Sequence, residues 1–529
     1  MEICKGKITR ALFWAIFALA FFSCRSGKKD FVPKRQGGDE IRCLFVTPYK
    51  KADVSSFIWL SALSREYGLT LNWSVMSEDE WESKKEEVLS SAFAPDLFIN
   101  ATKVEDYARH NSFFANLADF IGFDTQNLSI LFKEHKDAVR AATLYNGAIY
   151  ALPSFSAVDN QKAYSHPSKC VLFINQQLLK NLSLKSPETF SEFETTLDFF
   201  SRHSIEIPFD FCGWDGNEHS AVMLLGGLGI QLTDGGRNGY FLENNTVKNY
   251  FSDTRYRYLL KTLSRWYKKG LIKDISLSCD LESFLSRSHG NSEGQAIVAS
   301  AIGTEETAQF GKKLSSQYRA ILPPMERLCD ISEEEFSGIG YRRYWSVDTP
   351  NVKADSIALS AQCPKIQTVI SFIDSLYSTD YSVQSVFGGI ADGVTEKNAD
   401  FDFTVKTDCD YSNSFGEAGP HFLDTALQLS LPDSFVYAQL ERNAYQKLPV
   451  KNGNYYPEIY MKYPNEQLKT LGEIEMKTKE IARKARLRWI RGEGDIEKEW
   501  QAYLEELERA GLSSAIKIRQ TAYNRYLLK

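Results

Sequence analysis

IRCLFVT, residues Ile41–Thr47, opens the stretch of sequence that decides the fold. This short apolar run predicts a strand, and the helical spacing of Phe57, Leu60, Leu63 and Tyr67 predicts a helix that stops at Gly68. We expect the pattern to continue as a strand at Leu69–Val75, a polar helix at Glu78–Ser91 and a strand at Asp96–Asn100. Strands that alternate with helices over short joints form right-handed crossovers and a parallel sheet. Ligands of such sheets bind beyond the carboxyl ends of the strands, which here are residues 47–50 and 100–103.

Further along the chain, the same signals predict a second α/β block. Asn146-Gly147 between two apolar triplets indicates a two-residue hairpin turn. A strand is expected at Cys170–Asn175, followed by a helix with Ser186 as its cap and Pro187 at its first position. Helices are also predicted at Asp253–Lys269, which Gly270 ends, and between Asp495 and Gly511, where the apolar residues fall on one face.

The first 39 residues resemble an export signal followed by a spacer. Lys5, Lys7 and Arg10 precede a thirteen-residue apolar run that ends directly before Cys24. The run is shorter than the roughly 18 residues that a membrane-spanning helix needs. This layout resembles a bacterial lipoprotein signal, which implies cleavage after residue 23 and acylation of Cys24. Residues 24–39 then read as a flexible, polar tether that holds a water-facing protein at the membrane.

Size and composition place the remaining 506 residues among soluble multidomain proteins. The full chain has 43% hydrophobic and 25% charged residues and a net charge of −6; without the signal the charge is near −8. An acidic chain of this kind is not expected to bind nucleic acid. The cysteines are scattered without a CxxC pair and the seven histidines form no metal-binding motif, so we expect no metal and no cofactor.

Catalytic motifs are poorly represented. Gly290-Asn291-Ser292-Glu293-Gly294 formally fits GxSxG, but a helix is expected before it and a strand after it, which is the reverse of a nucleophile elbow. No P-loop is present, so any ATP hydrolysis would belong to another subunit. We therefore expect a protein that is not an enzyme, although paired carboxylates for glycoside hydrolysis stay open as an alternative.

Several separated segments resemble the extracellular solute-binding proteins of bacterial ABC importers, in the large lipoprotein branch that binds carbohydrates. They occur in the family's order: PDLFI (Pro95–Ile99), NGAIYALP (Asn146–Pro153), SPETFSEF (Ser186–Phe193), WYKKGLI (Trp266–Ile272), YRAILPPM (Tyr318–Met325), SFIDSLYS (Ser371–Ser378), FGGIADGV (Phe387–Val394), DIEKEWQAYLEELERAGL (Asp495–Leu512) and QTAYNRY (Gln520–Tyr526).

The resemblance implies a two-lobed α/β fold of the periplasmic-binding-protein kind. Each lobe would be a mainly parallel sheet flanked by helices, with the ligand cleft between the lobes. Residues 40–153 and about 323–390 are assigned to lobe 1, and residues 154–322 and about 391–529, including the C-terminal helices, to lobe 2. Hinge rotation would close the cleft around a bound solute.

The resemblance also implies a function: capture of a carbohydrate, an oligosaccharide in particular, and its delivery to the membrane permease of an ABC importer. The protein would be a monomer, exported and lipid-anchored to the cell envelope at the membrane outer face or in the periplasm. Two alternatives stay open at this point, a secreted glycoside hydrolase and a ligand-sensing co-receptor.

Candidate ligand-binding residues follow from what sugars need, flat apolar faces for C–H surfaces and planar polar groups for hydroxyls. Trp214 and its neighbour Asp215 lie among turn formers, which favours a loop position. The other candidates are at predicted strand ends or lobe crossings: Tyr49, Asn100, Phe155, Tyr344 and Trp345.

Overall fold

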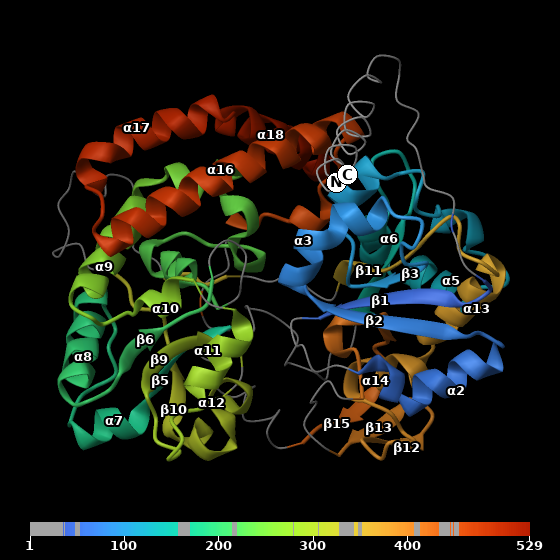
Figure 1. The fold of residues 1–529 in the computed structure, drawn as a ribbon, viewed down its shortest axis with the longest axis horizontal. Helices are drawn as coiled ribbons and strands as arrows, with labels where there is room; N and C mark the ends of the chain where they lie inside the picture. Colours follow the sequence, from blue (N-terminus) through green and yellow to red (C-terminus); the bar gives the residue numbers. More distant parts are fainter. Residues whose placement is uncertain are drawn as a thin grey trace, which may run out of the picture.

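Two large sheets, each with its own helices, and three long C-terminal helices are the main parts of the described structure (Figure 1). The computed structural model describes residues 35, 38–47, 53–156, 170–213, 219–278, 280–304, 306–326, 343–346, 352–406, 413–432, 445, 448 and 454–528. The expected export signal and Cys24 lie outside the described residues. In the part of the chain that is described, no helix is both long and apolar enough to cross a membrane.

Lobe 1 is built on a six-stranded sheet in the order β14-β4-β11-β3-β1-β2. Its strands are β1 (Ile41–Thr47), β2 (Leu71–Ser77), β3 (Leu97–Ile99), β4 (Ala151–Ser156), β11 (Val352–Leu359) and β14 (Phe422–Leu423). The predicted parallel arrangement of the first three strands is confirmed, because β1 pairs in parallel with both β2 and β3. β11 alone runs against its neighbours β3 and β4.

Helices cover both faces of this sheet. They are α2 (Ile58–Glu66), α3 (Glu78–Leu89), α4 (Val104–Arg109), α5 (Gln126–Glu134), α6 (Lys136–Ala142), α13 (Ile366–Leu376) and α14 (Thr379–Phe387). α2 and α3 match the predicted helices to within a few residues. Leu60 and Leu63 of α2 are buried against the sheet residues Cys43 and Phe45, as the helical spacing indicated.

Lobe 2 is built on a four-stranded sheet in the order β10-β5-β9-β6. These strands are β5 (Val171–Asn175), β6 (Ile207–Asp210), β9 (Val298–Gly303) and β10 (Tyr318–Ile321). β6 and β9 are parallel, whereas β5 runs against β9 and β10. The surrounding helices are α7 (Gln176–Asn181), α8 (Phe190–Arg202), α9 (Thr254–Lys268), α10 (Asp274–Leu277), α11 (Leu281–Ser288) and α12 (Glu306–Leu314).

The C-terminal helices α16 (Asn465–Arg491), α17 (Ile496–Arg509) and α18 (Leu512–Leu527) extend across the top of Figure 1 from lobe 2 to lobe 1. Trp489, Trp500, Tyr503 and Leu507 are buried in the same core as the lobe 2 sheet. At the other end, Ala108 of α4 is buried in a cluster that contains residues of α16 and α18. The helices therefore pack against both lobes, with the end of α16 and α17 on lobe 2 and the start of α16 on lobe 1.

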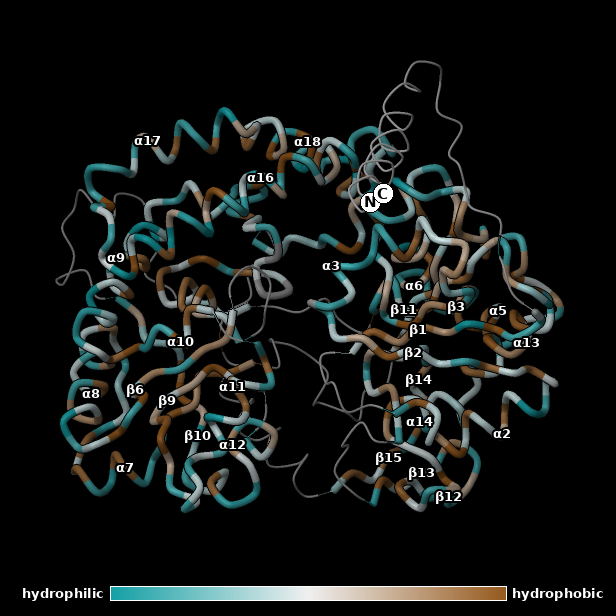
Figure 2. The backbone as a smooth tube through the Cα atoms, in the orientation of Figure 1, coloured by the Kyte–Doolittle hydropathy of each residue, from teal (hydrophilic) through white to brown (hydrophobic). Residues whose placement is uncertain are grey.

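Two smaller sheets complete the fold. A hairpin of β7 (Tyr240–Glu243) and β8 (Thr246–Asn249) packs against the C-terminal helices. A three-stranded sheet contains β12 (Thr395–Ala399), β13 (Asp402–Val405) and β15 (Gln428–Ser430). In Figure 2 the strands are mostly brown because their residues are apolar, whereas along the outer helices brown apolar residues alternate with teal polar ones.

Lobe 1 extends past the predicted limit near residue 390. Phe403 and Val405 of β13 pack against Val383 and Phe387 of α14 in one buried cluster. β14 then joins β4 of the six-stranded sheet. The segment up to β15 therefore belongs to lobe 1, because its apolar side chains have their partners there.

Two local predictions need correction. The turn at Asn146-Gly147 is present, since the Leu144 N–H donates to the Ala148 carbonyl at 2.9 Å, but no strands flank it. The N–H of Ile149 donates to Asn116 Oδ1 and its carbonyl accepts from Leu117 instead of from an opposite strand. α8 begins at Phe190 instead of after Ser186. Thr189 accepts the N–H of Glu192, and the Glu192 carboxylate accepts from Thr189 in return, so this capping box sets the start.

Candidate functional site

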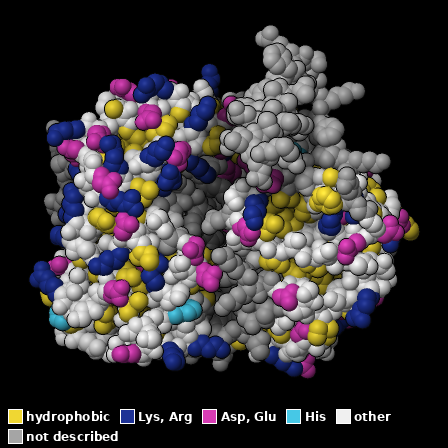
Figure 3. Space-filling view, in the orientation of Figure 1, with side chains coloured by type: hydrophobic (Ala, Val, Ile, Leu, Met, Phe, Trp, Pro, Cys, Tyr) yellow, Lys and Arg dark blue, Asp and Glu magenta, His cyan; other side chains and the backbone are white. Residues whose placement is uncertain are grey.

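Except for β5 and β11, which run the other way, the strands of the two main sheets have their carboxyl ends at the boundary between the lobes. In lobe 1, β4 is parallel to β3 and β1, since both β3 and β4 are antiparallel to β11. The chain leaves lobe 1 after β4, so this edge of the sheet faces lobe 2. In lobe 2, the chain leaves after β10, and β6 and β9 run in the same direction as β10. Sheets of this kind bind ligands at this edge. Figure 3 shows the described parts of the two halves on either side of the boundary.

The chain crosses this boundary three times. The first crossing joins β4 to β5, the second joins β10 to β11, and the third follows β15 and returns to the C-terminal helices. The described residues next to these crossings lie at one boundary, which is the arrangement that allows a hinge.

On the lobe 1 side, the crossings are held together by the last residues of β4. The Ser154 hydroxyl donates to the Gly419 carbonyl at 2.7 Å, and the Phe155 N–H donates to the His421 carbonyl at 2.9 Å. Ser156 Oγ lies 3.2 Å from His421 Nε2. β4 also pairs with the start of β11, so segments next to all three crossings meet here.

On the lobe 2 side, a second group of contacts connects residues next to the crossings. Trp345 Nε1 donates to the Cys170 carbonyl at 2.6 Å. The Tyr445 hydroxyl accepts the N–H of Leu172 at 2.9 Å and donates to the carbonyl of Ile321. The rings of Trp345 and Tyr445 contact each other with centroids 5.2 Å apart. Residues from all three crossings are thereby fixed to the adjacent strands β5 and β10.

Asn100 lies at the predicted position, directly after β3 at the edge that faces lobe 2. Its backbone is in the left-handed region with φ of 53°. Its side-chain amide donates to the Val46 carbonyl at 2.7 Å, and its Oδ1 accepts from Lys353 Nζ at 2.5 Å. The residue is half-buried. Asn100 and Lys353 therefore present a polar pair at the ends of β3 and β11.

Three other residues predicted to contact the ligand are instead buried against other parts of the protein. Phe155 is 6% exposed and lies against His135, with ring centroids 4.3 Å apart. Tyr344 is 7% exposed, and its N–H donates to the carbonyl of Gly226 at 2.9 Å. Trp345 is 2% exposed and belongs to the core of lobe 2. All three side chains are buried, and that of Trp345 joins two crossings, so we do not place them against a ligand.

The remaining predicted contacts, Tyr49, Trp214 and Asp215, lie outside the described residues. Their neighbours along the chain are described. Thr47 ends β1, and Gly213 follows β6 by three residues. Both strands end at the edge that faces the boundary.

Asp355 is a titratable group that the sequence reasoning missed. It lies where the pairing of β11 with β4 is interrupted, between Lys353 and Ile357. Burial raises the pKa of Asp355 to about 7 and the Glu105 carboxylate adds to the shift, whereas Lys462 opposes it. Lys462 lies just before α16, and its Nζ donates to the Ala141 carbonyl of lobe 1 at 2.9 Å. The sequence signal that could have pointed to Asp355 was a lone aspartate within the otherwise strand-like sequence VKADSIAL.

The described residues also contain a groove away from the lobe boundary. A groove of about 610 Å³ lies between α16 and α17, lined by Met476, Ile481 and charged neighbours. It is on the C-terminal helices and not between the lobes. Among the described residues, no group of three or more His, Cys, Asp or Glu side chains is placed to hold a metal ion.

Comparisons with known proteins agree with this geometry. No family model matches the chain. The chain is 23% identical over 508 residues to the fructooligosaccharide ABC transporter substrate-binding protein FusA of Streptococcus pneumoniae serotype 4, which covers 91% of this chain and 89% of that protein.

Solved structures share the fold. An HMO-binding, ABC-transporter-associated solute-binding protein from Bifidobacterium longum infantis superimposes with a TM-score of 0.76 at 22% identity, over 93% of this chain and 99% of that one. FusA in complex with kestose gives a TM-score of 0.77 at 20% identity, over 92% and 99%. The predicted two-lobed solute-binding fold is confirmed, as is the resemblance on which it rested.

Proposed function

We propose that this chain is the substrate-binding protein of an ABC importer and that it captures an oligosaccharide between its two lobes. The observation that carries the proposal is similarity over nearly the whole length to a protein named for fructooligosaccharide transport. The structure of FusA with kestose and that of an HMO-binding solute-binding protein support the same class of ligand. The geometry is consistent with this, because strand ends from both lobes face one boundary that three crossings span.

The proposed ligand contacts come from both lobes. Lobe 1 contributes Asn100, whose amide has further hydrogen-bonding capacity for a sugar hydroxyl, and Tyr49 after β1. Lobe 2 contributes the ring of Trp214 for stacking on the C–H face of a sugar and the carboxylate of Asp215 for its hydroxyls. Closure of the lobes excludes water, which strengthens each of these polar contacts.

We further propose that the protein is exported and held at the cell envelope by acyl chains on Cys24, acts as a monomer, and presents its closed form to permease subunits. Metabolic labelling with a fatty-acid analogue tests the anchor. The wild-type chain should carry the label and sediment with membranes, whereas Cys24→Ser should do neither.

The bound sugar is released unaltered in this proposal. Incubation of residues 40–529 with the sugar, followed by mass analysis of the recovered carbohydrate, separates binding from glycoside hydrolysis. An unchanged mass supports the binding protein, and shortened products would establish the hydrolase instead. Loss of uptake on deletion of the cognate permease with signalling intact would favour the co-receptor alternative.

Thermal-shift screening tests the proposal as a whole. Residues 40–529 are heated with single sugars from a panel of mono- and oligosaccharides that includes kestose. A ligand present at 100 times its dissociation constant adds about 2.7 kcal/mol to the free energy of unfolding. At least one oligosaccharide should raise the melting temperature more than its component monosaccharides do. A panel without any shift would overturn the proposal.

A further inference from the structure

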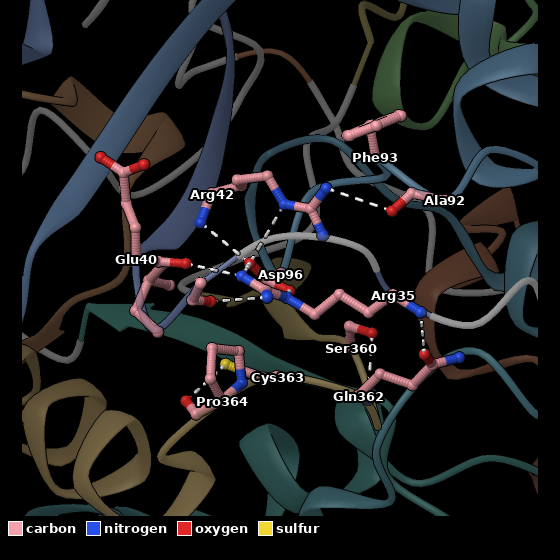
Figure 4. Close-up of polar contacts among 12 residues, drawn as sticks. Arg35, Glu40, Arg42, Ala92, Phe93, Asp96, Ser360, Gln362, Cys363 and Pro364 are labelled. Atoms are coloured by element: carbon pink, nitrogen blue, oxygen red, sulfur yellow. Dashed lines mark hydrogen bonds and ion pairs between the residues drawn. The ribbon is translucent and has the colours of Figure 1, made fainter.

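Arg35, in the segment expected to be a flexible tether, is fixed to lobe 1 by its side chain and its backbone. Its Nε donates to Asp96 Oδ1 at 2.8 Å and its Nη2 donates to Asp96 Oδ2 at 3.1 Å. Its backbone N–H donates to Gln362 Oε1 at 2.6 Å. The guanidinium also donates to the carbonyls of Gly38 and Glu40. Figure 4 shows the Arg35 guanidinium beside Asp96, and Gln362 at the backbone end of Arg35.

The acceptor is built for this contact. The Asp96 side chain is 2% exposed, and the Arg35 side chain is 13% exposed. The carboxylate also accepts the N–H of Arg42 at 2.9 Å, while the Asp96 backbone donates to Arg42 and accepts from Ser360. A buried carboxylate that receives a two-pronged guanidinium contact is a strong and directional site. Arg35 is therefore a defined end point for the segment that precedes it.

This site lies at the edge of the sheet that faces away from lobe 2. Asp96 directly precedes β3 and Arg42 is the second residue of β1, so both lie at the amino ends of parallel strands. The crossings to lobe 2 are at the carboxyl ends. The seven residues of β1 separate the two edges by about 20 Å.

We propose that Arg35 is the point at which the membrane anchor grips the protein, so that the outer edge of lobe 1 faces the lipid surface. This inference rests on the proposed acylation of Cys24. Eleven residue steps separate Cys24 from Arg35, which limits their distance to about 40 Å at full extension. An anchor at this edge leaves the lobe boundary clear of the membrane and lobe 2 able to rotate.

An exposed aromatic residue lies at the same edge. Phe93, three residues before Asp96, is 68% exposed, and Figure 4 shows it beside Ala92, whose carbonyl accepts from Arg42. An apolar ring next to arginine side chains suits the zone of lipid headgroups better than open water. Phe93 also offers a position at which the approach of this edge to lipid can be measured.

Hydrogen exchange tests the grip of Arg35. The full chain, Arg35→Ala and the charge-matched control Lys34→Ala are compared through the backbone amides of residues 35–41. The wild type and the control should exchange at least tenfold more slowly than Arg35→Ala. Equal exchange rates in the wild type and in Arg35→Ala would show that Arg35 does not fix this segment to lobe 1.

Fluorescence quenching tests the orientation. A fluorescent non-natural amino acid is placed at position 93, or at position 199 on α8 of lobe 2, where Phe199 is 40% exposed. The lipidated protein is bound to phosphatidylcholine vesicles that carry a headgroup quencher. The probe at position 93 should be quenched more strongly, and Arg35→Ala should reduce that difference. Equal quenching at the two positions on lipidated protein would overturn the orientation, whereas absence of lipid on Cys24 would contradict the proposed acylation on which the orientation rests.

Failure of this inference is distinguishable from failure of the proposed function. Arg35→Ala leaves the strand ends at the lobe boundary untouched, so any sugar-induced thermal shift should be the same as in the wild type. Absence of that shift in the wild type contradicts sugar capture and leaves the exchange and quenching results to stand or fall by themselves.

Discussion

At the scale of single residues, the proposed sugar contact of Trp214 gives the first prediction. Trp214→Ala should weaken oligosaccharide binding at least about tenfold, or ~1.4 kcal/mol, because a stacking face is lost. Titration calorimetry measures the change. Phe123→Ala is the matched control, since Phe123 is 92% exposed on lobe 1 and its removal should leave affinity unchanged. Unchanged affinity in Trp214→Ala would remove this ring from the site.

Trp345 gives the opposite prediction. Its ring is buried and its indole N–H is bound to Cys170. Trp345→Ala should therefore lower the free energy of unfolding of the ligand-free protein by about 3–5 kcal/mol. Denaturant unfolding checks this. A variant as stable as the wild type that has lost sugar binding would return Trp345 to the ligand site.

Asp355 predicts a dependence of stability on pH. The pKa of Asp355 is raised to about 7 in the folded protein, against about 3.9 in an unfolded chain. Between these values the folded state holds a proton that the unfolded state releases, so this group stabilises the fold at low pH, and that stabilisation is lost as the pH rises to 7. Because the carboxyl is partly exposed, we expect an effect on the order of 2 kcal/mol.

Unfolding measured at pH 5 and pH 7.5 tests this dependence, with Asp355→Asn as the matched control that cannot titrate. The wild type should lose more stability than the variant over this interval. Identical losses in the two proteins would show that Asp355 does not titrate there.

Sequence reasoning placed residues better than it placed their side chains. Asn100 directly follows β3, as its position after an apolar run indicated, and Phe155, expected as a wall beside the hinge, lies at the end of β4. The sequence did not indicate that Tyr344 and Trp345 are buried, since their hydrogen-bond partners Gly226 and Cys170 are distant in the chain. Asp355 was missed for the same reason, because Glu105 and Lys462 reach it from other elements.

At the scale of elements, the hydrogen bonds of Tyr445 predict that its hydroxyl stabilises the attachment of the crossings to β5 and β10. Tyr445→Phe removes the hydroxyl that bridges Leu172 of β5 and Ile321 of β10. The free energy of unfolding should fall by about 1–3 kcal/mol, as expected when buried hydrogen bonds lose their partner. Tyr145→Phe, on a ring that is 53% exposed, is the control and should change little. A loss no larger than in the control would show that the bridge does not stabilise the crossings.

Elements with strong periodicity were predicted well. α9 begins after its cap Asp253, with Gly270 beyond it in the left-handed region, and α17 begins after Asp495 as expected. The errors fell where local signals compete. Ser186-Pro187 and Thr189 with Glu192 both resemble helix starts, and the reciprocal bonds of the second pair decide. Asn146-Gly147 gives a turn, but tertiary contacts of Ile149 replace the second strand.

At the scale of the whole molecule, the two lobes were predictable from the order of the family-like segments, and most of the chain's path was not. The assignment of residues 395–430 to lobe 1 depends on Phe403 and Val405 finding α14 and on β14 finding β4. Short strands of two to five residues carry too little periodicity to reveal such partners. The direction of β5 and β11 follows from the crossings, since each enters its lobe at the boundary.

The central claim, that the lobes close on an oligosaccharide, is tested most directly by small-angle X-ray scattering of residues 40–529 with and without the sugar that gives the largest thermal shift. Closure of two lobes about a hinge should reduce the radius of gyration at saturation, and removal of the sugar by dialysis should restore it. A radius that stays the same while the sugar is demonstrably bound would contradict the account.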